Sequence, residues 1–236
     1  MGRFRHEGVA FNNITGHVYQ TEDKTDGLFY RFIPKVKEKL VEGGKLQVLS
    51  FKDWRGIDTR NWNKKYIEVN KKYKVRWVDI DDVESPNDDL RYRGNNKGGA
   101  IFARGEGIFF ADNTVFFTAT TGGENKSGQI WKYVPGKNDS DGTIELFFES
   151  SNSNDLNMPD NIVLSPNGNV ILCEDGKGTD RLICIKPDKT ISYLASNALN
   201  NSEIAGACFS PDNKILFINI YKPTITLAIK GPWHQI

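Results

Sequence analysis

A strand–turn–strand unit that recurs four times restricts the fold of this chain more than any other sequence feature. The four copies cover residues 6–23, 105–123, 159–176 and 203–220, and each contains short runs rich in Val, Ile, Phe, Tyr and Trp around a turn. A third strand follows each copy, ending at a proline in three of the four, and then a fourth strand. Four-stranded meanders repeated every 40–50 residues, roughly, are typical of propeller blades. The sequence therefore predicts an all-β fold. We expect a β-propeller with about four blade-like repeats, arranged as an incomplete ring.

The repeats extend along the whole chain, so residues 1–236 are expected to form a single β-propeller domain or the C-terminal portion of one. The main irregularity is a charged, Trp-rich insertion at residues 52–98, which is long enough to overhang a site as a loop or lid. The first residues enter the first repeat directly and contain no hydrophobic signal-peptide core. We therefore expect upstream blades to be missing. The chain alone should then be aggregation-prone, bind metal weakly and show little activity.

Composition excludes several classes of function. The net charge is +1, with 31 basic and 30 acidic residues, which argues against an electrostatic nucleic-acid or membrane binder. No apolar run approaches the length of a membrane helix, so we expect no membrane insertion. Cys173, Cys184 and Cys208 are too few and too scattered for a disulfide framework or a CxxC metal clip.

Acidic residues return at matched points of the repeats. The acids that open the four copies are Glu7, Glu106, Asp160 and Glu203. The second matched points, one strand out and one strand back, hold Glu22-Asp23, Thr120, Glu174-Asp175 and Asn219. Since equivalent positions of propeller blades are related by rotation about the axis, these carboxylates should share one cavity. Buried carboxylates repel one another unless multivalent cations neutralise them, and calcium takes six to eight oxygen ligands. The pattern therefore indicates a metal site.

A candidate phosphate-binding residue lies next to these acids. Arg104 precedes Glu106 by two residues on the same strand, so both side chains should lie on one face. A guanidinium beside a polycarboxylate metal site can bind phosphate oxygens bidentately. The alternative is a salt bridge between Arg104 and a neighbouring carboxylate. His6 should point to the opposite face from Glu7, as a structural histidine.

Several motifs in order carry a family resemblance. They read GRFRHEG, VYQTED, FARGEG, FFTATTGG, MPDNI, ILCEDG and EIAGACFSPD. Together they resemble the PhoX family of alkaline phosphatases over almost the whole chain, from Gly2 to Trp233. The resemblance implies a β-propeller phosphomonoesterase that acts on small-molecule phosphate monoesters and uses calcium and iron. It also implies a cluster of metals held by carboxylates, and export to the periplasm or cell surface.

The resemblance also implies roles for individual residues. Glu7 and Glu106 would be metal ligands, and Arg104 would be the catalytic arginine that contacts the phosphate. The matching motifs place further metal-ligand candidates at Glu22, Asp23, Asp160, Glu174 and Glu203, and a substrate-binding candidate at Asn161. In the family, a cysteine-bearing segment upstream of the first motif supplies a thiolate to iron, whereas this chain starts at that motif. Cys173 is at an analogous point of another repeat, where we expect a buried structural thiol.

Two other readings stay open from the residues. One is another calcium-dependent propeller hydrolase, such as a lactonase, for which a single calcium ion and an acid suffice. The other is a non-catalytic propeller in which the metals only stabilise the fold.

Overall fold

The prediction of an all-β propeller-type fold is confirmed by a computed structural model, which describes residues 1–137 and 141–236. The first meander is β1 (His6–Phe11), β2 (Val18–Glu22), β3 (Gly27–Pro34), β4 (Gly44–Phe51) and β5 (Lys72–Ile80). The second is β7 (Gly105–Ala111), β8 (Thr114–Ala119), β9 (Gln129–Pro135) and β10 (Asp141–Glu149). The third is β11 (Pro159–Leu164), β12 (Val170–Glu174), β13 (Arg181–Ile185) and β14 (Ile191–Ser196). The fourth is β15 (Ile204–Phe209), β16 (Ile215–Ile220) and β17 (Ile225–Lys230).

Short elements connect these strands. They are the 3-10 turn η1 (Leu40–Glu42), the helix α1 (Leu90–Asn96) and the two-residue strand β6 (Ile101–Phe102), which pairs with β3. Within the described residues, no helix has the length and apolar character needed to cross a membrane.

The first two blades are joined at their outer edges. Strand β5 pairs with β4 on one side and with β10 on the other, so both blades belong to one ten-stranded sheet. β5 lies inside the range 52–98, part of which therefore folds as a strand of the sheet. Its sequence KYKVRWVDI alternates, and Tyr73, Val75 and Trp77 are all buried in the core. Since Trp77 Nε1 donates a hydrogen bond to the Tyr133 hydroxyl at 2.8 Å, the indole is also fixed to the second blade.

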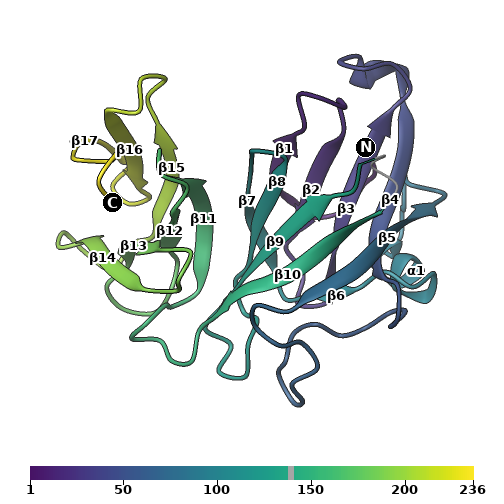
Figure 1. Ribbon diagram of the computed structural model, residues 1–236, viewed down its shortest axis with the longest axis horizontal. Helices are drawn as coiled ribbons and strands as arrows, with labels where there is room; N and C mark the ends of the chain where they lie inside the picture. Colours follow the sequence, from purple (N-terminus) through teal and green to yellow (C-terminus); the bar gives the residue numbers. More distant parts are fainter. Residues whose placement is uncertain (138–140) are drawn as a thin grey trace.

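The first strands of the four blades lie in a row, β1–β7–β11–β15 (Figure 1). Glycines allow this close approach, because a Cβ at Gly8 would lie 2.5 Å from the carbonyl oxygen of Glu106. A Cβ at Gly107 would likewise lie 2.4 Å from the carbonyl oxygen of Asp160. The row thus packs backbone against backbone, which leaves no room for any other residue type at these two positions.

Threonines at matched positions of two blades hydrogen-bond across the row. The Thr21 hydroxyl of β2 donates to the Glu106 carbonyl at 2.5 Å. The Thr118 hydroxyl of β8 donates to the Asp160 carbonyl at 2.8 Å. Each threonine therefore fixes the backbone of an acid on the neighbouring blade.

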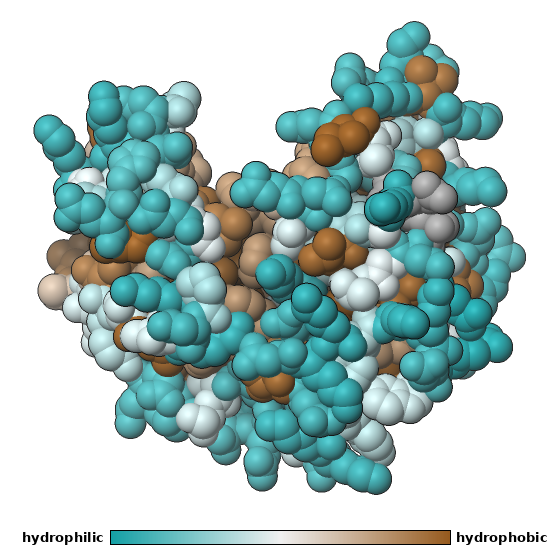
Figure 2. Space-filling view, viewed as in Figure 1, coloured by the Kyte–Doolittle hydropathy of each residue, from teal (hydrophilic) through white to brown (hydrophobic). Residues whose placement is uncertain are grey.

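The described chain forms an arc of two lobes. Figure 1 shows β11–β17 on the left and β1–β10 on the right, and Figure 2 shows the surface hollowed between them at the top, with apolar residues on its floor. The arrowheads of β11 and β15 point towards this hollow, so the beginnings of these strands face the other way. The matched acids therefore lie at the end of the molecule opposite to the hollow.

Candidate metal centre

Four backbone hydrogen bonds define which residues of the blades are equivalent. In each, the residue after the second strand donates to the residue before the first strand: Asp23 to Arg5 at 3.0 Å, Thr120 to Arg104 at 2.9 Å, Asp175 to Met158 at 3.0 Å and Tyr221 to Glu203 at 3.0 Å. Glu203 is thus equivalent to Arg104. Because the opening acids Glu7, Glu106 and Asp160 lie two residues further on, their equivalent in the fourth blade is Ala205. The sequence alignment of Glu203 with these acids is therefore wrong by two residues.

Three carboxylates nevertheless meet at the junction of the third and fourth blades. One oxygen from each of Asp160, Asp175 and Glu203 lies within 4.8 Å of the other two, and all three residues are half-buried. Burial, followed by a hydrogen bond with Asp160, raises the pKa of Glu203 to about 7. The pKa of Asp175 is also raised, first by burial and then by the charge of Asp160. We call these residues the acid trio; their oxygen-only donor set suits a hard cation such as calcium.

Glu7, Asp23 and Glu106 extend the acid trio towards the first two blades. Burial, together with the charges of Asp160 and Asp23, raises the pKa of Glu106 to about 9. The pKa of Glu7 is raised by burial and then by Asp23 and Asp160. Since such a group of carboxylates is unfavourable without cations, the residues present fit a metal centre. We call these three residues and the acid trio the acid cluster.

The structure does not bring Glu22 and Glu174 into the acid cluster. Glu22 accepts hydrogen bonds from Leu28 N at 3.1 Å and from the Tyr30 hydroxyl at 2.8 Å, within its own blade. Glu174 accepts from Arg181 Nε at 2.7 Å. Both side chains are buried, and their contacts hold the turn between the second and third strands. The sequence prediction chose Glu174 and left out Asp175, although neighbouring residues leaving a strand point to opposite faces.

Arg104 joins the acids of the first two blades. Its Nε donates to Asp23 Oδ1 at 2.7 Å, and its Nη2 donates to Glu106 Oε1. The side chain is 25% exposed, so solvent reaches part of the guanidinium. Arg104 therefore forms the salt bridges of the alternative interpretation, and its exposed part is accessible to a ligand. Arg5, which sequence reasoning missed, lies 3.2 Å from the second oxygen of Asp23, and its position before the first strand was the available signal.

Three other predicted residues have structural contacts. Asn161 Oδ1 accepts a hydrogen bond from Gly206 N, which links β11 to β15. Cys173 is fully buried among apolar side chains, and burial raises its pKa to about 12, so it stays a protonated thiol. The His6 ring stacks on Phe4 at 3.7 Å, and its Nε2 lies 3.0 Å from the carbonyl oxygen of Gly2.

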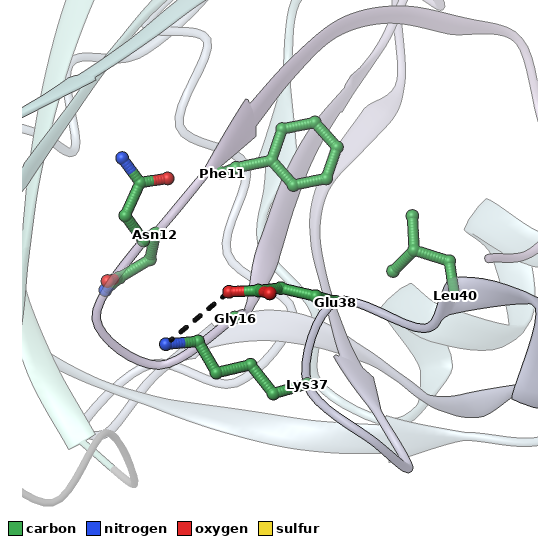
Figure 3. A pocket seen from close by; sticks show the side chains of 7 residues that line it. Phe11, Asn12, Gly16, Lys37, Glu38 and Leu40 are labelled. Atoms are coloured by element: carbon green, nitrogen blue, oxygen red, sulfur yellow. Dashed lines mark ion pairs between the residues drawn. The ribbon is translucent and has the colours of Figure 1, made fainter.

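Two pockets differ in their relation to the acid cluster. A groove of about 530 Å³ is lined by Asp175 and Glu203, so it gives solvent access to the acid trio. A pocket of about 320 Å³ lies at the other end of the first blade (Figure 3). There, Phe11 and Leu40 line the pocket with Lys37 and Glu38, whose charged atoms lie 3.9 Å apart. Because this pair cancels its charge, the second pocket is not suited to a phosphate.

The fold and the acid cluster define a β-propeller protein with an arginine beside a carboxylate centre. The profile of the family "Alkaline phosphatase PhoX" matches residues 1–224. The chain belongs to this family, and the resemblance drawn from its motifs is confirmed.

A solved structure supports the fold. PhoX of Pseudomonas fluorescens, in complex with the transition state analogue vanadate, is 21% identical with a TM-score of 0.68. The alignment covers 94% of this chain and 49% of that one, so the chain spans about half the length of that protein. The periplasmic gluconolactonase of Pseudomonas aeruginosa is 9% identical over 95% of this chain and 68% of its own, with a TM-score of 0.41. Among curated proteins, none matches.

Proposed function

We propose that this chain contributes the acid cluster and the arginine of a metal-dependent phosphomonoesterase. The observation that carries this proposal is Arg104, a partly exposed guanidinium held between Asp23 and Glu106. Family membership supports it, and so does the vanadate bound to the similar protein of Pseudomonas fluorescens. Small-molecule phosphate monoesters are the proposed substrates, and export to the periplasm or cell surface is proposed from the same family resemblance.

The acid trio is the proposed calcium site, because calcium prefers carboxylate oxygens. Glu7, Asp23 and Glu106 are proposed to take part in binding further calcium or iron, the second metal that the family resemblance implies. When bound, multivalent cations would supply positive charge to the phosphoryl oxygens. These residues would hold the cations near Arg104, since Asp23 and Glu106 belong to the acid cluster and also form ion pairs with Arg104.

Arg104 is proposed to bind and orient the phosphate. Its backbone is fixed on both sides, because its N–H donates to the Lys24 carbonyl at 2.8 Å and its carbonyl accepts from Thr120 N at 2.9 Å. A carboxylate that binds a cation competes less strongly for the guanidinium. The fork of Arg104 can then turn part of its donors to phosphate oxygens, where it would neutralise equatorial charge.

Separate variants of the arginine and the acid test the proposal. Arg104→Ala should abolish vanadate binding and phosphomonoester hydrolysis but leave calcium and iron contents, measured by mass spectrometry, within about a factor of two. Glu106→Gln should lower metal content first. Wild-type chain that binds calcium but turns over a lactone and no phosphomonoester would overturn the proposal in favour of a lactonase. Metal binding without turnover of either substrate would favour a non-catalytic propeller.

A further inference from the structure

A polar pocket of about 590 Å³, separate from the two pockets described above, lies beside the acid trio. It is formed by the loop after β8, the loop before β11 and Lys177. Met158 lines it, and the Met158 carbonyl accepts the hydrogen bond from Asp175 N. Lys177 follows Asp175 by two residues. The pocket thus shares a wall with the acid trio.

The lining of this pocket has a definite chemistry. It consists of Lys126 and Lys177 together with amides, hydroxyls and one methionine. Among the lining residues, all of which lie in the described part of the chain, there is no carboxylate and no aromatic ring. Such a pocket suits a ligand that carries hydroxyl groups and a negative charge. A nucleobase would find no ring on which to stack.

Lys126 is held in place by the insertion. Its Nζ lies 4.7 Å from the centre of the Trp62 ring, in a cation–π contact. Trp62 Nε1 donates to the Thr121 carbonyl at 2.6 Å, and Arg60 lies over the same ring at 4.2 Å. Arg60 is in turn paired with Asp58 at 2.6 Å. A lysine that is already positioned loses less conformational entropy when it binds an anion.

We infer that this pocket binds the leaving group of the substrate, and that its preferred ligand is an anionic polyol such as a sugar acid. The inference rests on the proposed function for the position of the phosphate. An ester whose phosphate lies at Arg104 and the acid cluster can extend its alcohol portion over the shared wall at Met158. The ammonium groups of Lys126 and Lys177 then meet the negative group, and the amides and hydroxyls meet the polyol.

A kinetic comparison tests this specificity. Phosphoglycerate has an anionic polyol leaving group, glycerol phosphate a neutral one and p-nitrophenyl phosphate an aromatic one. In Lys126→Ala/Lys177→Ala, the KM for phosphoglycerate should rise about tenfold with little change in kcat, and the KM for p-nitrophenyl phosphate should stay within about twofold. The control Lys45→Ala/Lys214→Ala removes two exposed lysines at the opposite ends of the blades and should leave all three substrates unchanged. An equal KM increase for all three substrates, or none for phosphoglycerate, would overturn the inference.

Direct binding separates this inference from the proposed function. Gluconate is titrated into chelator-treated protein, with sorbitol as its neutral counterpart. Wild type and control should bind gluconate saturably, and the Lys126→Ala/Lys177→Ala variant should bind it about tenfold more weakly. Binding with this pattern supports the pocket even if no phosphate ester is hydrolysed. An active phosphatase that does not bind gluconate saturably would overturn the pocket and leave the proposed function standing.

Discussion

At the scale of single residues, Glu174 and Asp175 are adjacent but have separate structural roles. Glu174 pairs with Arg181 inside the third blade, whereas Asp175 is part of the acid trio. Glu22 and Asp23 repeat this division in the first blade, with Asp23 bound to Arg104. One of each pair therefore stabilises the blade, and the other can bind a ligand.

Exchanging each acid for its amide should separate these roles. Glu174→Gln leaves Arg181 without its carboxylate partner and should lower the free energy of unfolding by about 3 kcal/mol. Asp175→Asn removes a repelled charge, so metal-free stability should not fall, while calcium affinity should fall at least about tenfold. Urea unfolding and calcium titration provide the two measurements. A loss of calcium affinity only in Glu174→Gln would reverse the assignment.

Glu22 should make metal-free stability depend on pH. Burial raises its pKa to about 7 from 4.5, and it is fully buried. Below pH 4.5 the carboxyl is protonated in both the folded and the unfolded state, so it does not lower the stability of the fold. Between pH 4.5 and 7 the unfolded state loses its proton first, so the folded state becomes less stable as the pH rises. The free energy of unfolding of Glu22→Gln, measured relative to wild type, should therefore increase by about 2 kcal/mol between pH 5 and pH 8.

The measurement for Glu22 is urea unfolding of both proteins in the presence of a chelator. The quantity compared is the difference between variant and wild type at each pH, which cancels the titration of the other groups. A difference that is the same at pH 5 and pH 8 would contradict the raised pKa.

At the scale of elements, sequence reasoning predicted local features better than contacts between blades. The strand–turn–strand copies and the positions of Glu106 and Asp160 at strand starts follow from local alternation and turns, and the structure has them. The register of Glu203 was missed although a local signal exists. Ser165 and Ser210 each begin the turn after the first strand, and counting back five residues from them gives Asp160 and Ala205. Strand β5 was missed although its alternation of buried residues with lysines and an arginine is a strand signal, because the whole charged segment was interpreted as one insertion.

The contact between β7 and β11 should tolerate no side chain at Gly107. Gly107→Ala would place a methyl group 2.4 Å from the Asp160 carbonyl oxygen and should cost about 3 kcal/mol of folding stability. Gly43→Ala is the control, since its φ is 78° but no atom lies within 4 Å of the added Cβ. It should cost only about 1 kcal/mol, through backbone strain. Equal costs in thermal or urea unfolding would mean that the row of first strands can open.

At the scale of the whole chain, the acid trio connects two blades. Asp160 and Asp175 belong to the third blade, and Glu203 directly precedes β15 of the fourth. A cation bound by all three would therefore hold the blades together. Since a ligand that binds only the folded state stabilises it, metal binding and the docking of these blades are linked.

Calcium should accordingly raise the thermal stability of the chain. At about 100 times the dissociation constant the gain is about 2.7 kcal/mol, seen as a concentration-dependent increase in Tm. Glu203→Gln should reduce this increase strongly, and Glu38→Gln, in an exposed ion pair far from the acid trio, should not. A calcium response that is identical in the two variants would show that the cation binds elsewhere.

The backbone before two of the first strands has the same unusual conformation. Arg104 and Met158 both have φ of 55°, and both use their N–H and carbonyl groups in equivalent hydrogen bonds. The same backbone conformation therefore occurs with two different side chains. Duplicated blades would inherit a position whose backbone geometry is set by main-chain hydrogen bonds, while the side chain at that position can change. In such a ring, a guanidinium or a thioether can be exchanged at one position without rebuilding the scaffold, so the chemistry of the centre can evolve faster than its shape.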